Sequence, residues 1–147
     1  MFTKPPLTAP VLGQREIETL GLFWQDSSAS LSATDILTLI VNQTDEPNEV
    51  ITINTVQSTI ERLWKKKLLS RRKQGKAFIY APIYTKQEVM SCLIKEISDT
   101  LGGGDDSAIM SGIFTFLKGR DTQNPVALLQ TLEQNYAVKS TTGSNDE

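Results

Sequence analysis

The sequence predicts a mainly α-helical protein with a small β hairpin, in the order helix, helix, helix, hairpin, followed by further helices. Three observations predict this fold class. Apolar residues recur at helical spacing in three segments before residue 67. Two short runs with strand character then flank a Lys-Gln-Gly turn, and helical spacing returns after residue 85. The layout is that of a winged helix-turn-helix with additional C-terminal helices.

Each of the first three predicted helices has a start signal and one apolar face. Gly13 is an acceptable N-cap for the first helix. Ser32 and Asp35 form a capping box for the second, and Thr52 can cap the third. The apolar faces consist of Ile17, Leu20, Phe23 and Trp24 in the first helix, Ile36, Leu39 and Ile40 in the second, and Val56, Ile60 and Leu63 in the third.

The predicted hairpin follows the third helix directly. After Lys67 the runs LLSRRK and KAFIYAP lie on either side of the turn, where Gly75 supplies a positive φ. Thr85 and Glu88 then form a capping box for a further helix. The predicted divisions are a flexible N-terminal arm at 1–11, a winged-helix domain at 12–83, a helical dimerisation region at 84–136 and a disordered tail at 137–147.

Composition argues against most enzyme classes. The 147 residues include no histidine, which removes the commonest general base and the commonest metal ligand. The single cysteine, Cys92, cannot form an internal disulfide, and no segment resembles a signal peptide or a membrane span. We therefore expect a cytoplasmic protein that is not an enzyme, needs no cofactor or metal and has no membrane partner.

Positive charge is concentrated in one segment. Residues 54–76 hold eight of the 15 basic residues and one acid, Glu61. The rest of the chain has seven basic residues and 16 acids, so the protein is polarised rather than merely acidic. A basic patch on an acidic chain indicates an anionic partner.

A helix in the DNA major groove beside a basic hairpin on the phosphates would explain this segment. The bases would be read by Asn54, Thr55, Gln57 and Ser58. The backbone would be held by Arg62, Lys65, Lys66, Arg71, Arg72, Lys73 and Lys76. The simpler alternatives are a solvated helix start and a charged hairpin edge that resists aggregation. Trp64 and Phe78 are expected in the core rather than stacked on nucleic acid.

The motifs also resemble a known family. The segments LGQREIETLGLFW, LSATDILTLI and INTVQSTIERLWKKKLLSRRKQGKAFIYAP are similar to those of the BlaI/MecI/CopY-type penicillinase-repressor family, over roughly residues 12–118. The resemblance implies a dimeric winged-helix repressor that binds two-fold symmetric, palindromic operators. It also implies that the C-terminal helices form the homodimer.

Four departures from the family pattern stand out, and one of them is that the C-terminal part is only loosely similar. Lys67 replaces the glycine that usually ends the third helix, at a cost of about 1 kcal/mol if the turn is kept. The connection from Val41 to Ile51 is longer than usual. Glu61 places a carboxylate where phosphates would lie, or where a cytosine amine could donate to it.

The apolar stripes after the hairpin predict the dimer contacts. They consist of Val89, Leu93, Ile97, Leu101, Ile109, Ile113, Phe116 and Leu117. An intramolecular core is the alternative, but short helices that follow a complete winged helix cannot bury such faces alone.

Neither of the two inducing signals known in the family can be assigned to this sequence. The bond comparable to the Asn-Phe bond that is cut in β-lactam-sensing members is Thr115–Phe116, which lacks the asparagine. Copper-responsive members have paired Cys-x-Cys motifs, which Cys92 alone cannot supply. Asp105 and Asp106 fit a polar turn better than a metal site. A regulatory protease or sensor protein therefore stays unassigned.

The second functional hypothesis belongs to another class. The same Lys and Arg cluster could dock an acidic protein surface, since basic patches serve both kinds of partner. Salt-sensitive binding to DNA fragments separates the two hypotheses.

Overall fold

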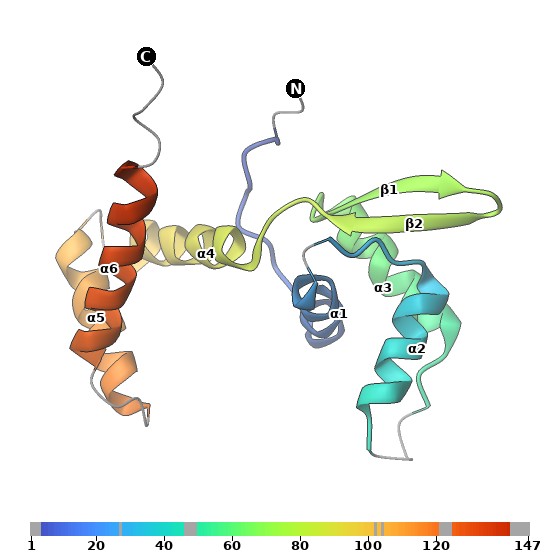
Figure 1. Ribbon diagram of the computed structural model, residues 1–147, viewed down its shortest axis with the longest axis horizontal. Coiled ribbons are helices and arrows are strands. Elements are labelled where there is room, and N and C mark those ends of the chain that lie inside the picture. The colour runs from blue at the N-terminus through green and yellow to red at the C-terminus, as the bar shows by residue number, and fades with distance from the viewer. Residues whose placement is uncertain are drawn as a thin grey trace. The chain divides into compact units, whose positions relative to one another are not determined.

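The computed structural model describes residues 4–26, 28–45, 50–101, 103, 105–120 and 125–141 (Figure 1). The chain divides into two compact units, Met1–Glu96 and Ile97–Glu147. The elements are α1 (Gln14–Gln25), α2 (Ala33–Gln43), α3 (Ile53–Lys65), β1 (Leu69–Gln74), β2 (Ala77–Pro82), α4 (Lys86–Leu101), α5 (Asp106–Gly119) and α6 (Pro125–Thr141). The predicted class, mainly helical with a two-stranded hairpin in a winged helix-turn-helix, is confirmed.

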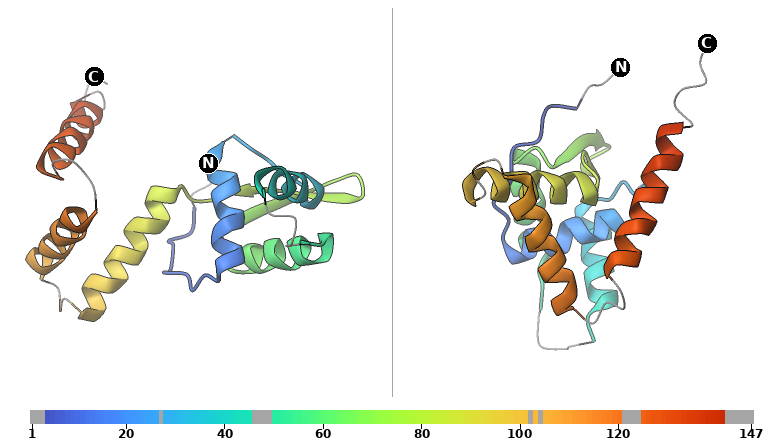
Figure 2. Two further views of the ribbon diagram at one scale, coloured as in Figure 1. Left: turned by 90° about the horizontal axis from the view of Figure 1, so that it is seen from below. Right: turned by 90° about the vertical axis from the view of Figure 1, so that its left-hand side faces the viewer.

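The core of the first unit lies where α3 packs against α1, α2 and β1. Fully buried side chains come from each of these elements and from the turn after α3, and they are Leu20, Phe23, Ile36, Ile60, Leu63, Leu68 and Leu69. The hairpin extends beyond the three helices in two views (Figures 1 and 2). A conventional helical core therefore supports a protruding wing.

In α1, the prediction that Ile17 belongs to the core is wrong. Ile17 is 48% exposed, whereas its neighbour Glu16 is only 5% exposed. The physical reason is a distant cation, because Lys66 Nζ lies 2.6 Å from Glu16 Oε2 and compensates the buried carboxylate. Helical spacing alone could not reveal this partner.

The hairpin is antiparallel and pairs Leu69 with Pro82 at one end and Gln74 with Ala77 at the other. Gly75 has the predicted positive φ, 63°. Leu31 adds a single bridge to Tyr80 through two backbone hydrogen bonds of 2.9 Å. This bridge attaches the wing to the segment that precedes α2.

The junction between α3 and the wing is a Schellman motif centred on Lys67. The amide of Lys67 donates to Trp64 O at 3.0 Å, and the amide of Leu68 donates to Leu63 O at 3.0 Å. Lys67 has φ 63°, the left-handed conformation that glycine adopts at lower cost. Leu63 and Leu68 are both buried, as this motif favours. The chain thus keeps the turn without its usual glycine.

The first part of the arm differs from the flexible segment that we expected. The described residues 4–11 are held by the body of the first unit, with Lys4 Nζ 2.7 Å from Glu88 Oε1 and the Tyr84 hydroxyl donating to Pro5 O. At the other end, Lys66 Nζ donates to Val11 O at 2.6 Å. Residues 4–11 are therefore part of the folded unit.

The second unit contains the end of α4 together with α5 and α6, which contact each other. No residue of α5 is buried. Asp105 caps α5, and hydrogen bonds from the side chain and backbone of Ser107 hold the pKa of Asp105 below its ordinary value. Helix α6 continues to Thr141, so residues 137–141 of the predicted disordered tail are helical, while 142–147 lie outside the described residues.

Among the residues that the structure describes, no helix is both long enough and apolar enough to cross a membrane.

Lys67→Gly should raise the free energy of unfolding by about 1 kcal/mol, because glycine adopts the left-handed conformation without a Cβ clash. Urea unfolding at one fixed protein concentration measures this change. Lys65→Gly is the matched control: it removes the same charge from a helical position and should lower stability by about 1 kcal/mol. An equal loss of stability in both variants would contradict a strained turn at Lys67.

Candidate nucleic-acid interface

The exposed face of α3 carries the residues that we expect to read bases. Asn54, Thr55, Gln57 and Ser58 are all exposed, whereas Val56 between them is buried. The Ser58 hydroxyl donates to Asn54 O at 2.8 Å, so its hydrogen already has an acceptor within the helix. The Thr55 hydroxyl likewise lies 3.1 Å from the Thr52 hydroxyl. The amides of Asn54 and Gln57 are therefore the better candidates for bidentate contacts to bases.

Charged residues continue this face toward the end of α3. Arg62 and Lys65 are exposed, as is Glu61. Glu61 Oε1 lies 3.7 Å from Lys65 Nζ, an exposed pair one helical turn apart. Such pairs contribute little to stability, so Lys65 can exchange this carboxylate for a phosphate at small cost.

Lys66 does not join this face. Its ammonium donates to Glu16 Oε2 and to Val11 O, each at 2.6 Å, and Glu16 is buried. Moving this cation to a phosphate would leave a buried carboxylate without its partner, which is strongly unfavourable. The structure thus gives Lys66 a structural role, in contrast to its predicted contact with DNA.

The predicted cations of the wing are divided between its two faces. Arg71 pairs with Tyr80 and Lys73 with Phe78, whereas Arg72 pairs with Ile79. Side chains directly opposite in an antiparallel pair share one face, and successive residues alternate. Arg71 and Lys73 therefore lie on the face that carries Tyr80, which is buried, and Arg72 lies on the other.

Arg71 lies over two aromatic rings. Its Cζ lies 3.4 Å from the centroid of the Trp64 ring and 4.4 Å from that of Phe78. Phe78 is 41% exposed, so the prediction that it belongs to the core is wrong, while Trp64 is partly buried against the core. Both distances are those of cation–π contacts, and the N–H groups of the guanidinium are the part that can bind an anion.

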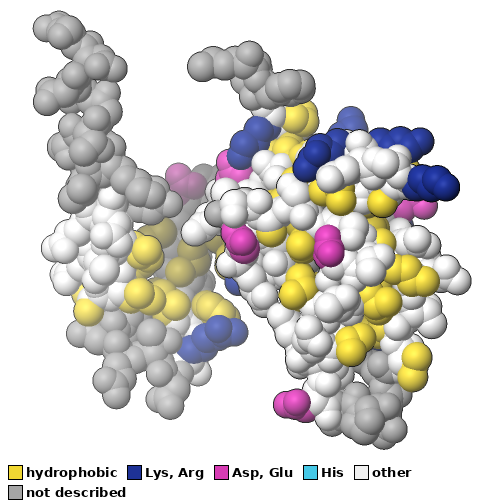
Figure 3. Space-filling view, turned by 45° about the vertical axis from the view of Figure 1, so that its right-hand side comes forward, with side chains coloured by type: hydrophobic (Ala, Val, Ile, Leu, Met, Phe, Trp, Pro, Cys, Tyr) yellow, Lys and Arg dark blue, Asp and Glu magenta, His cyan; other side chains and the backbone are white. Residues whose placement is uncertain are grey.

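A hollow of about 450 Å³ joins the wing to the helices. Its lining includes Gln57 of α3, Arg71 and Lys76 of the wing, and Ser32 and Thr34 at the start of α2. Lys and Arg side chains gather over the hairpin in the space-filling view (Figure 3). The structure thus brings the predicted base-reading helix and part of the basic wing to one concave surface.

The predicted dimer residues separate into two groups. Val89 is 3% exposed and Leu93 packs against the core of the first unit, so both serve the fold of that unit. Val89 is thereby corrected from a dimer contact to a core residue, because α4 begins against the winged helix. The partly or largely exposed group is Ile97, Leu101, Ile109, Ile113, Phe116 and Leu117.

Sequence reasoning missed further exposed apolar side chains in the second unit. Met110, Phe114, Val126, Leu128 and Leu132 are between 37% and 56% exposed. Their apolar character was visible in the sequence, but which sides of α5 and α6 remain uncovered depends on how these two helices pack. The Thr115–Phe116 bond lies within α5, where the Thr115 hydroxyl donates to Ser111 O at 2.9 Å.

Comparison with known proteins decides the family. Residues 12–139 match the model of the penicillinase repressor family. The chain belongs to this family. The match includes the winged helix and most of the C-terminal helices, so it spans both units. This member of the penicillinase repressor family is a DNA-binding transcriptional repressor.

The solved structures similar to the chain include two of BlaI, and the comparison with curated proteins gives no match. The DNA-binding domain of the repressor BlaI is 22% identical, with a TM-score of 0.45, and the likeness covers 55% of this chain and 90% of that one. Monomeric Bacillus licheniformis BlaI in complex with the blaP half-operator is also 22% identical, with a TM-score of 0.41 and the same coverage.

Arg71→Lys should lower the free energy of unfolding by about 1 kcal/mol, because lysine keeps the charge but lacks the planar guanidinium that lies over the Trp64 and Phe78 rings. Urea unfolding measures the loss. Arg72→Lys makes the same exchange at the neighbouring exposed position and should change stability by less than about 0.5 kcal/mol. Equal effects of the two exchanges would mean that the stack contributes nothing.

Proposed function

We propose that this repressor binds a palindromic operator as a homodimer, with α3 in the major groove and the basic wing against the DNA backbone. The observation that carries the proposal is the shared concave surface of α3 and the hairpin. It presents the amide of Gln57 from α3 beside Arg71 and Lys76 of the wing, and the amide of Asn54 is exposed one helical turn earlier. Amides in the groove can specify sequence, and cations on phosphates supply affinity.

Residue roles follow from these positions. Asn54 and Gln57 read base edges, with Thr55 and Ser58 beside them. Phosphates are held by Arg62, Lys65, Arg72, Lys73 and Lys76, and by the in-plane edge of Arg71. Glu61 weakens non-specific binding, because an exposed carboxylate repels any phosphate that approaches α3. A cytoplasmic location accords with chromosomal DNA as the partner.

The apolar surface of the second unit supports the dimer. Leu101 is 84% exposed, Phe116 is 57% exposed and α5 has no buried residue. A unit with this much uncovered apolar surface gains most by pairing with an identical copy. Two copies would also supply two recognition helices for the two halves of a palindrome.

Arg72→Ala combined with Lys76→Ala should weaken binding to operator and to unrelated DNA by similar factors. Two lost phosphate contacts should also reduce the slope of log affinity against log salt by about 2. The operator is obtained by selecting genomic fragments with the unmodified chain, and mobility shifts across a salt series give both quantities.

Asn54→Ala combined with Gln57→Ala is the complementary variant, because it removes amides and leaves every cation in place. It should lose roughly 10-fold or more in preference for the operator while affinity for unrelated DNA and the salt slope stay unchanged. If the wing variant bound DNA normally, the proposed backbone contacts would be wrong. If the unmodified chain bound no fragment in a salt-sensitive manner, docking to an acidic protein surface would replace DNA binding.

Leu101→Glu should raise the dimer dissociation constant roughly 100-fold or more, since each subunit loses the burial of one leucine side chain and gains a charge. Sedimentation equilibrium measures this constant. Thr100→Glu places the same charge at the adjacent exposed polar position and should leave the dimer intact. A dimer equally stable in both variants would exclude Leu101 from the interface.

A further inference from the structure

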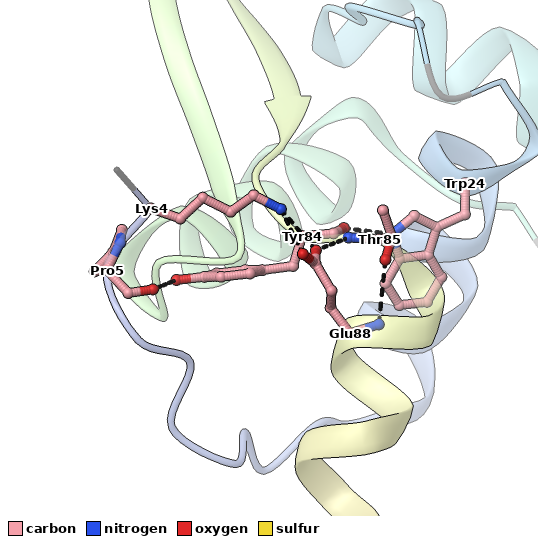
Figure 4. A network of polar contacts seen from close by, with 6 residues as sticks. All are labelled: Lys4, Pro5, Trp24, Tyr84, Thr85 and Glu88. Carbon is pink, nitrogen blue, oxygen red and sulfur yellow. Dashed lines mark hydrogen bonds and ion pairs between the residues drawn. The ribbon is translucent and has the colours of Figure 1, made fainter. Parts of the chain in front are cut away.

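Residues 4–12 form a strap that connects the end of α3 to the start of α4. The Tyr84 hydroxyl donates to Pro5 O, and Lys4 Nζ reaches both carboxylate oxygens of Glu88 at 2.7 and 2.8 Å (Figure 4). Cys92 Sγ lies 3.3 Å from Leu7 O. Glu88 and Cys92 lie one turn apart on the same side of α4, and Tyr84 lies just before the helix, so the strap follows the start of α4 along one side.

The other end of the strap is anchored on the winged helix. Lys66, directly after α3, donates to Val11 O at 2.6 Å, and Leu7 and Leu12 pack against the core. The indole of Trp24 in α1 donates to Tyr84 O at 3.0 Å, which fixes the backbone just before α4 (Figure 4). The strap therefore spans from the base of the recognition helix to the first turns of α4.

The anchors on α4 are specific but individually weak. The Lys4 and Glu88 side chains are 45% and 44% exposed, and exposed pairs contribute little to stability. The Lys4 ammonium, followed by the Thr85 amide, holds the pKa of Glu88 below its ordinary value, so the pair is intact at neutral pH. Lys4 Nζ also lies 5.6 Å from the centroid of the Tyr84 ring. Contacts of this kind can orient α4, although they contribute little to the free energy of unfolding.

We propose that the strap fixes the direction in which α4 leaves the winged helix, and so sets the half-site spacing that the dimer accepts. This inference rests on the proposed function, because it requires a dimer on a two-part operator. Helix α4 is continuous from Lys86 to Leu101, a length of about 24 Å at 1.5 Å per residue. A pivot of about 10° at its base moves its far end by roughly 4 Å, comparable to the 3.4 Å rise of one base pair.

The test compares spacing preference with half-site affinity in the full chain. The DNA probe is a genomic fragment selected with the unmodified protein, together with versions that have one or two base pairs added or removed between the half-sites, and a single half-site. Lys4→Met with Tyr84→Phe removes two of the three side-chain contacts at this end of the strap, leaves that of Cys92 and keeps the Thr85–Glu88 cap. Lys86→Met is the matched control, since it removes an exposed cation from the first turn of α4 outside the strap.

The unmodified chain and Lys86→Met should lose at least about 10-fold in affinity when the spacing is wrong, because the two half-sites can no longer be engaged together. The strap variant should show a penalty below about 3-fold at unchanged half-site affinity. Unchanged half-site affinity shows that the winged helix is intact, a result that a purely structural defect would not give. Lys4→Met alone, which alters an exposed ion pair and a contact with the Tyr84 ring, should show the same trend if the double variant folds poorly.

Two results would overturn the proposal while leaving DNA binding in place. These are a strap variant with the full spacing penalty, and an unmodified chain with no spacing penalty. Failure of the unmodified chain to bind any fragment would instead overturn the proposed function, and the strap proposal with it.

Discussion

Burial of one stripe of α3 is the constraint on which the rest of the molecule depends. Val56, Ile60 and Leu63 are at most 3% exposed, so the helix cannot rotate without exposing its apolar face. Its polar residues must therefore face outward. After the Schellman turn at Lys67, Leu68 is buried in the same core. This burial fixes the position at which the wing begins. One hydrophobic stripe thus orients both halves of the candidate interface.

The basic segment is less uniform than its charge implies. Lys66 compensates a buried carboxylate, Arg71 lies over two rings, and Lys65 lies near Glu61. Arg62, Arg72, Lys73 and Lys76 remain exposed at the surface. Part of the positive charge therefore builds the scaffold and part is presented to the partner. Net charge alone would therefore overestimate the number of cations that are available to bind DNA.

Local signals in the sequence predicted the local structure well. The capping box at Ser32, the cap at Thr52 and the positive φ of Gly75 are all present, because each depends on residues a few positions apart. The family motif likewise located the left-handed turn at Lys67. The helix order and the hairpin follow from these signals together with apolar periodicity.

The features that the sequence did not reveal are long-range pairs. Lys66 and Glu16 are 50 positions apart, and Lys4 and Glu88 are 84 apart. Neither pair leaves a periodic trace in the sequence, so Glu16 was missed as a buried residue and the arm was taken as flexible. Phe78 was misassigned because its ring covers a guanidinium at the surface rather than other apolar side chains.

The position of α4 gives the strap its significance. The first part of this helix belongs to the winged-helix unit and its last turn belongs to the C-terminal unit. A continuous helix is stiff over this length, so an orientation imposed at its first turns is transmitted along its axis. Side chains such as Val89 hold that base through burial, which resists separation but tolerates small rotations. Directional polar contacts from the strap restrict those rotations. Apolar packing therefore attaches α4 to the winged helix, and hydrogen bonding sets the direction of its axis.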